Sequence, residues 1–249
     1  MSLVDVSGNG LVCSTWGDGR ADIVMLHDGL GSIAQWRDVP GAIHNATGRT
    51  VLAYDRAGHG TSTPVPTGPW PVDWLHQEAE LLAELLDLRA VDRPLLVGHS
   101  DGGSIALLTA AGGRSLRGVV TLAAHAYVEE VCVERIRSMR GEAEGWVARL
   151  GRVHDEPAAV FEAWSGVWTS EAFRAWDVRP DLHAIDCPSM IVQGLDDEYG
   201  TPEQAWSTAA AIGDNGTCVL LPGLGHLLHH EAPERIVQIV RGFERSLPM

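Results

Sequence analysis

The stretch from Gly98 to Gly102 has the residue types and spacing best suited to do chemistry. It reads G-H-S-D-G, follows the apolar run PLLV and precedes the helix-like run GSIALLTAA. A serine in a G-x-S-x-G turn between a strand and a helix is typical of a nucleophile. Backbone N–H groups at the start of the following helix then face a developing oxyanion. A phosphate-binding loop is the alternative, but the stretch has neither a Lys-Ser/Thr pair nor G-x-G-x-x-G spacing.

Later parts of the chain supply the two other groups that a serine nucleophile needs. Such a serine requires a base, and the base requires a carboxylate that orients it. The apolar run SMIVQG at 189–194 continues into LDDE, which places carboxylates just past the end of a strand. The run TCVLLPG at 217–223 continues into LGHLLHHE, which places histidines in the same kind of position. Serine, then aspartate, then histidine is the chain order of the α/β-hydrolase arrangement.

The elements that must position these residues alternate between strand and helix patterns. Short apolar runs of the kind found in strands covered on both faces occur at 22–28, 50–55, 94–99, 118–124, 189–194 and 217–223. The run GLVCSTWG at 10–17 is expected to be an edge strand. Helical patterns lie between the runs, most clearly PVDWLHQEAELLAELLDL at 71–88. This alternation predicts an α/β fold with a mostly parallel, doubly covered sheet and right-handed crossovers.

One segment, from Val128 to Arg179, interrupts the alternation with successive amphipathic helical patterns. It contains four of the nine tryptophans and two of the three phenylalanines. We therefore expect residues 1–127 and 180–249 to form the core and residues 128–179 to form a helical cap inserted between core strands. The aromatic residues can pack a small core within the cap or line a substrate pocket beneath it. The second interpretation is favoured, because pockets at such junctions prefer aromatic linings.

Composition excludes several classes of partner. A formal net charge of -15 disfavours binding to nucleic acid and to anionic membranes. No apolar run approaches the roughly 20 residues of a membrane span, and the start MSLVDVSGNG lacks the pattern of a secretory leader. The four cysteines are far apart and form no C-x-x-C pair, so we expect free thiols in a reducing cytoplasm and no zinc site.

Five motifs occur in the order in which α/β-hydrolases carry them. They are LHDGLGS at 26–32, YDRAGHGTS at 54–62, VGHSDGGS at 97–104, QGLDDEYGTPEQ at 193–204 and LPGLGHLLHHEAPE at 221–234. Over nearly its whole length the chain therefore resembles the α/β-hydrolase superfamily, in particular its small cofactor-independent serine hydrolases with a helical cap. The resemblance implies that no cofactor is needed, that Ser100 is the nucleophile and that His226 is the general base and acid. Relatives place the triad acid three residues after the glycine that ends the strand, here Gly194, which favours Asp197 over Asp196.

The same resemblance implies the surroundings of the nucleophile. Backbone N–H groups of Gly29 and Asp101 would form the oxyanion hole. Asp28 stands where many relatives have glycine, and we expect its charge to point away from the oxyanion. Four residues are predicted to contact substrate: Leu30, His125, Trp164 and Trp168.

The remaining histidines are expected to be structural. His27, His59 and His99 occupy turn positions at which relatives keep a polar residue. The group His226, His229 and His230 is conceivable as a metal site, but it lacks an acidic ligand at clear helical spacing. We therefore predict no metal.

These residues predict a serine hydrolase that cleaves a carboxylic ester, lactone or thioester of a small apolar molecule through an acyl-enzyme. A serine nucleophile excludes the aspartate-based mechanisms of haloalkane dehalogenases and epoxide hydrolases. One alternative is a carbon–carbon bond hydrolase of ring-cleavage products, although those enzymes resemble one another in a tryptophan where this chain has Leu227. The other is a ligand-binding protein of low turnover, since fold alone does not decide activity.

Overall fold

The centre of the molecule is one sheet of eight strands. The computed structural model describes residues 1–65 and 67–248. Across the sheet the strands follow the order β1-β2-β4-β3-β5-β6-β7-β8. β2 runs antiparallel to both of its neighbours, β1 and β4, and the strands β3 to β8 are parallel to one another. Their bounds are β1 (Ser2–Val6), β2 (Asn9–Trp16), β3 (Ile23–Leu26), β4 (Val51–Tyr54), β5 (Leu95–His99), β6 (Gly118–Leu122), β7 (Ser189–Gly194) and β8 (Gly216–Leu221).

One edge of this sheet, formed by β1, differs from the prediction. The run at 10–17 is β2, which is the second strand, and β1 forms the edge by pairing Val4 with Leu11 and Val6 with Asn9. β1 has a weak apolar pattern, because only Val6 among its five residues is fully buried. A short, mostly exposed edge strand has little apolar pattern, so β1 could not be recognised from the sequence.

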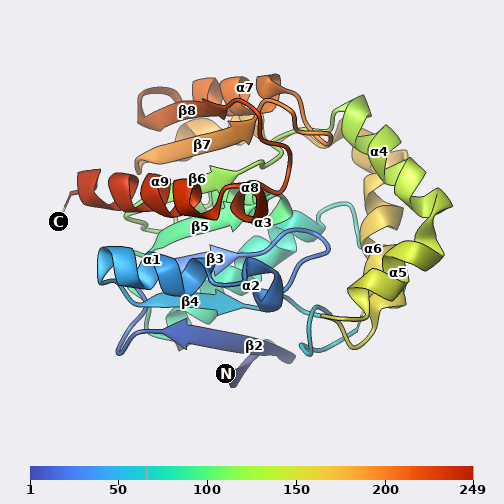
Figure 1. The fold of residues 1–249 in the computed structure, drawn as a ribbon, viewed down its shortest axis with the longest axis horizontal. Coiled ribbons are helices and arrows are strands. Elements are labelled where there is room, and N and C mark those ends of the chain that lie inside the picture. Colours follow the sequence, from blue (N-terminus) through green and yellow to red (C-terminus); the bar gives the residue numbers. More distant parts are fainter. Residues whose placement is uncertain (66, 249) are drawn as a thin grey trace.

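Helices cover both faces of the sheet, as the alternation of patterns predicted. α1 (Val39–Thr47) and α9 (Pro233–Ser246) lie on one face (Figure 1), and α2 (Trp74–Leu88), α3 (Asp101–Ala111) and α7 (Pro202–Ile212) lie on the other. Successive residues of β5 point to different cores: Val97 packs with Ile43 and Val240, and Leu96 packs with Leu82 and Ile105. Within the described part of the chain, no helix combines the length and apolar character needed to cross a membrane.

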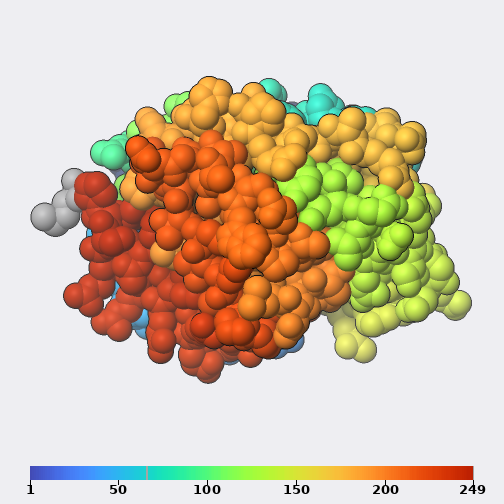
Figure 2. All heavy atoms as spheres, turned by 90° about the horizontal axis from the view of Figure 1, so that it is seen from above, coloured from blue at the N-terminus to red at the C-terminus, as the bar shows by residue number. Residues whose placement is uncertain are grey.

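A helical segment lies beyond the carboxyl ends of the parallel strands. Between β6 and β7 the chain forms α4 (Glu130–Gly141), α5 (Ala143–Leu150), α6 (Pro157–Trp168), and the short 3-10 helices η2 (Ala172–Ala175) and η3 (Arg179–Ala184). α4, α5 and α6 stand apart from the sheet in Figure 1, and in Figure 2 the residues of α4 and α5 form one end of the molecule. The inner side of α6 is apolar, with buried Phe161, Trp164 and Trp168. We call α4, α5 and α6 the cover helices.

Candidate active site

The turn between β5 and α3 holds Ser100 in a strained conformation. Its φ of 51° and ψ of -122° lie outside the regions that L residues favour. A Cβ on Gly98 would lie 2.2 Å from the carbonyl oxygen of Gly102, and one on Gly102 would lie 2.3 Å from that of Leu26. Because these neighbours are backbone atoms that cannot swing aside, the turn closes only with glycine at both positions.

Replacing Gly98 with alanine should therefore destabilise the fold. We expect Gly98→Ala to lower the free energy of unfolding by about 1–3 kcal/mol or more, the usual cost of forcing an extra methyl into a packed site. Gly242→Ala is the matched control, because a Cβ there meets nothing within 4 Å and Gly242 lies inside α9. That variant should be neutral or up to about 1 kcal/mol more stable. Urea unfolding of both variants measures the difference, and equal stabilities would contradict the packing argument.

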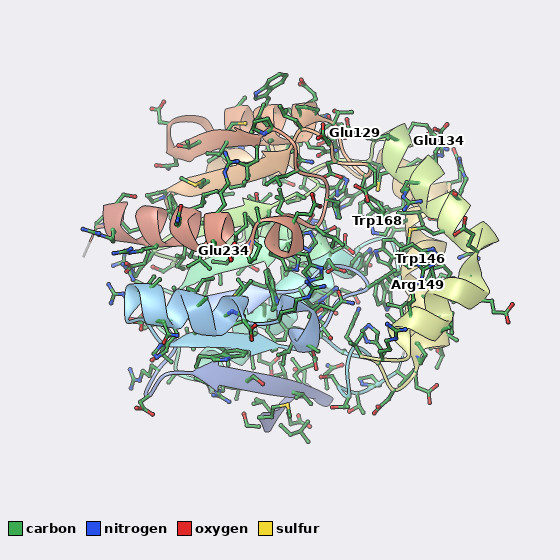
Figure 3. All side chains as sticks on the ribbon, in the orientation of Figure 1. Glu129, Glu134, Trp146, Arg149, Trp168 and Glu234 are labelled. Atoms are coloured by element: carbon green, nitrogen blue, oxygen red, sulfur yellow. The ribbon has the colours of Figure 1, made fainter. Side chains whose placement is uncertain are left out.

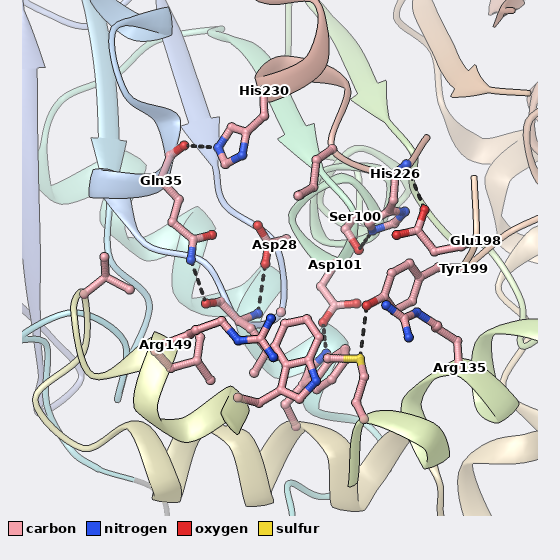
Figure 4. A pocket seen from close by; sticks show the side chains of 18 of the residues that line it. Asp28, Gln35, Ser100, Asp101, Arg135, Arg149, Glu198, Tyr199, His226 and His230 are labelled. Carbon is pink, nitrogen blue, oxygen red and sulfur yellow. Dashed lines mark hydrogen bonds between the residues drawn. The ribbon is translucent and has the colours of Figure 1, made fainter. Parts of the chain in front are cut away.

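Ser100, His226 and Asp197 meet at the carboxyl ends of three strands. The Nε2 of His226 lies 3.0 Å from the Oγ of Ser100, and its Nδ1 lies 2.9 and 3.0 Å from the two carboxylate oxygens of Asp197. Ser100 follows β5, Asp197 follows β7, and His226 follows β8. All three side chains are almost fully shielded from solvent. The structure thus brings together the three residues singled out in the sequence (Figure 4 shows Ser100 beside His226).

The charges of this pair are set by burial and by each other. Burial by itself would lower the pKa of His226, but the charge and hydrogen bond of Asp197 outweigh it and hold that pKa above its usual value. Burial would raise the pKa of Asp197, but His226 and the backbone N–H of Tyr199 lower it. Gln193 donates a further hydrogen bond to Asp197 at 2.6 Å. Asp197 is therefore a carboxylate fixed by three donors, whereas Asp196 next to it is exposed to solvent.

Two backbone N–H groups near Ser100 have no hydrogen-bond acceptor within residues 1–65 and 67–248. Among the described residues, neither the N–H of Gly29 nor that of Asp101 donates a hydrogen bond to another protein group. A Cβ on Gly29 would lie 2.0 Å from the Nε1 of Trp164 and 2.3 Å from the Oδ2 of Asp101, so a larger residue there would have to displace these two side chains. Trp164 Nε1 donates to Asp101 Oδ2 at 2.9 Å and ties α6 to the residue after Ser100. Burial raises the pKa of Asp101 to about 6.

The carboxylate of Asp28 is held by the backbone of its own loop and by His99, a histidine that was expected to be structural. It accepts a hydrogen bond from the N–H of Leu30 at 3.0 Å and lies 3.3 Å from Nδ1 of His99. The other ring nitrogen of His99 lies 2.9 Å from the backbone oxygen of His226. Burial would raise the pKa of Asp28, but His99 and its histidine neighbours hold it well below the usual range. The carboxylate of Asp28 therefore faces His99, and His99 also joins the loop of Asp28 to that of His226.

A cavity of about 520 Å³ opens above Ser100 and His226. Its walls include all four residues predicted to contact substrate: Leu30, His125, Trp164 and Trp168. Sequence reasoning missed most of the other lining residues, among them Met139, Trp146 and Leu150 of the cover helices and Tyr199 after β7. Figure 3 shows Trp146 and Trp168 on the side of the cover helices that faces the sheet. The sequence predicted helices here and a cavity-facing side only for Trp164 and Trp168, so the cavity-lining residues of α4 and α5 were not anticipated.

His125 and the histidines after His226 have defined partners. The Nε2 of His125 pairs with the backbone oxygen of Tyr199 at 3.1 Å, and burial lowers its pKa, so the ring is neutral. His229 packs on Trp36, and His230 pairs with the backbone oxygen of Gln35. In residues 1–65 and 67–248, no three His, Cys, Asp or Glu side chains gather as a set of metal ligands.

Comparison with known proteins places the chain in a family. The model of the alpha/beta hydrolase family matches residues 23–239. The chain therefore belongs to the alpha/beta hydrolase family, as its motifs indicated.

Individual relatives cover most of the chain. It is 29% identical over 243 residues to the non-heme chloroperoxidase CPO-A1 of Kitasatospora aureofaciens, which covers 85% of this chain and 86% of that protein. It is also 29% identical over 209 residues to the human serine hydrolase BPHL, covering 78% of this chain and 69% of that protein. The crystal structure of the enol-lactonase from Burkholderia xenovorans LB400 has a TM-score of 0.77 at 22% identity and covers 98% of this chain and 100% of that one. This last similarity shows the fold alone.

Proposed function

We propose that this protein is a serine hydrolase that cleaves an ester-type bond, in a carboxylic ester, lactone or thioester, through an acyl-enzyme. The observation that carries the proposal is the continuous contact from Ser100 through His226 to Asp197 beneath a cavity with aromatic walls. A serine hydroxyl is a poor nucleophile by itself, and a neighbouring imidazole held by a carboxylate is the arrangement that activates it.

The proposed reaction has two halves. Ser100 Oγ attacks the substrate carbonyl as His226 Nε2 takes the hydroxyl proton, and Asp197 stabilises the imidazolium that results. The N–H groups of Gly29 and Asp101 bind the oxyanion of the tetrahedral intermediate. His226 then protonates the leaving group, which departs and leaves the acyl-enzyme. A water molecule gives its proton to His226 and attacks the acyl carbon, and return of the proton to Ser100 frees the acid product.

The cover helices act in this proposal as the cap predicted for residues 128–179. Their buried aromatic rings face the cavity and would enclose the apolar part of a substrate. Leu227 follows His226 and lines the cavity. Because it occupies the position of the tryptophan expected in carbon–carbon hydrolases, ester-type bonds are the favoured substrates.

A fluorophosphonate probe tests the proposal directly. We expect one covalent adduct on Ser100 in intact-protein and peptide mass spectra, together with hydrolysis of p-nitrophenyl esters of graded acyl length. Absence of both labelling and hydrolysis would leave the ligand-binding alternative, which needs no reactive serine.

The tryptophans of α6 should set which acyl lengths are preferred. If Trp164 and Trp168 contact the acyl group, changing either to alanine should move the preference toward longer esters, since the space released favours burial of more methylene groups at about 0.8 kcal/mol each. The measurement is kcat/KM across the series of p-nitrophenyl esters. Trp206→Ala is the control, because Trp206 lies on α7 and is exposed. A uniform loss on all esters with a lowered melting temperature would assign these rings to packing instead.

A further inference from the structure

The arginines between β6 and β7 fall into two groups according to their partners. Four of the seven each form an ion pair with a carboxylate: Arg137, Arg140, Arg174 and Arg179. The other three line the cavity, and among the described residues none of them forms an ion pair with a carboxylate: Arg135, Arg149 and Arg152. The ion-paired arginines do not line the cavity. Among the described arginines between β6 and β7, those without an ion pair are therefore the ones that line the cavity.

The contacts of these arginines leave hydrogen-bonding capacity unused. Arg149 lies over the ring of Trp146, 4.5 Å from its centroid, and donates only its Nε, to the backbone oxygen of Gly145. Arg135 lies 5.5 Å from the ring centroid of Tyr199, and its buried Nε has no hydrogen-bond partner among the described residues. Figure 4 shows Arg149 and Arg135 on opposite sides of Ser100. Both rings hold the guanidinium groups in place without neutralising them.

The carboxylates that share this cavity are already engaged elsewhere. Asp28 pairs with His99, Asp101 accepts from Trp164, and Glu198 accepts from the backbone N–H of His226 at 3.3 Å. Arg37, which lies outside the cover helices, also lines the cavity and adds a fourth arginine with no carboxylate partner among the described residues. In a chain of net charge -15, carboxylates are abundant, so unpaired arginines around one cavity are not explained by a shortage of partners.

We infer that the cavity arginines bind a carboxylate of the substrate, either through Arg135 or through Arg149 together with Arg152. A guanidinium group presents parallel N–H donors that match the two oxygens of a carboxylate. The substrate class is thus an ester, lactone or thioester with an apolar body, which packs on the aromatic rings, and a free carboxylate away from the bond that is cleaved. The inference rests on the proposed function and narrows it.

Matched pairs of esters test the inference. One pair carries the carboxylate on the acyl side: mono-p-nitrophenyl adipate and its methyl ester. The other pair carries it on the alcohol side: 4-acetoxybenzoate and its methyl ester. We expect kcat/KM to favour the charged member of one pair by at least about tenfold at low ionic strength, and the preference to fall in 0.5 M NaCl because salt screens partly exposed charges. The pair that shows the preference identifies the side on which the carboxylate is held.

Three variants assign the effect to residues. Arg135→Gln and the double change Arg149→Gln with Arg152→Gln should each be assayed on all four esters. At least one should lose most of the preference for the charged ester while keeping hydrolysis of the neutral one, which also shows that the variant is folded. Arg137→Gln is the control, since Arg137 shares α4 with Arg135 but pairs with Glu130. It should keep the wild-type preference.

The outcomes separate this inference from the proposed function. Faster hydrolysis of the neutral esters in both pairs, with Ser100 still labelled by the fluorophosphonate, would overturn the carboxylate site and leave the hydrolase assignment intact. A preference that survives in both cavity variants would overturn the assignment to these arginines. Absence of labelling and of all ester hydrolysis would instead overturn the proposed function.

Discussion

Ser100→Ala is expected to abolish covalent labelling by a fluorophosphonate and to lower kcat by roughly 10³- to 10⁶-fold, the range seen when a member of such a triad is removed. The change deletes one oxygen that lies 3.0 Å from His226 Nε2, and among the described residues no other serine or threonine lines the cavity. The neighbouring hydroxyl of Ser104 cannot substitute, because it is buried and donates to the backbone oxygen of His125 at 2.6 Å.

The free energy of unfolding of Ser100→Ala provides a second measurement, because the backbone at position 100 is strained. Alanine at φ 51° is as strained as serine, so the variant should keep the wild-type free energy of unfolding to within about 1 kcal/mol. Loss of labelling with unchanged stability identifies a chemical role. Ser104→Ala serves as the control and should retain labelling. Full labelling of Ser100→Ala, with the adduct on another residue, would refute the assignment of the nucleophile.

The parts of the fold that the sequence predicted are those decided by local patterns. Strands β3 to β7 are recognisable as continuous apolar runs, because nearly all of their residues are buried. β8, the other edge strand, was predicted from its apolar run although it is mostly half-buried. The cover helices were anticipated from the loss of strand patterns after β6. β1 was missed for the opposite reason, since an edge strand with only Val6 fully buried carries little pattern.

The candidate site also consists of residues that the sequence predicted and contacts that it did not. Ser100, the carboxylates at 196–198 and the histidines at 226–230 were predicted to meet because each group comes shortly after a strand, and the carboxyl ends of parallel strands lie at the same edge of the sheet. The choice of Asp197 and His226 within these groups came from the resemblance to α/β-hydrolases. The link from Asp28 through His99 to the backbone of His226 was not predicted. Asp28 and His99 are 71 residues apart in the chain, and His99 and the carbonyl of His226 are 127 residues apart. Such contacts depend on the packing of loops, which leaves no periodic pattern in the sequence.

Asp197→Asn is expected to lower kcat by about 10⁴-fold, whereas Asp196→Asn should change it by no more than about twofold. The carboxylate of Asp197 accepts from His226 Nδ1, from Gln193 Nε2 and from the N–H of Tyr199. An asparagine has one oxygen for these three donors, so its NH₂ group would face one of them. Where it faces His226 Nδ1, it favours the tautomer protonated on Nε2, which cannot take the proton of Ser100. Asp196 is the matched control because it is exposed and adjacent in the chain.

The pH dependence of the residual activity distinguishes orientation by Asp197 from a general loss of structure. His226 must be neutral to accept a proton, so wild-type kcat/KM should fall on acidification through the pKa of His226, which lies above its usual value. Asp197→Asn removes the charge that raises this pKa and leaves burial, which lowers it. The acid limb of the residual kcat/KM should therefore move to lower pH, while in Asp196→Asn it should stay at the wild-type position. An acid limb that does not move in Asp197→Asn, or equal losses of kcat in the two variants, would show that Asp197 is not the partner of His226.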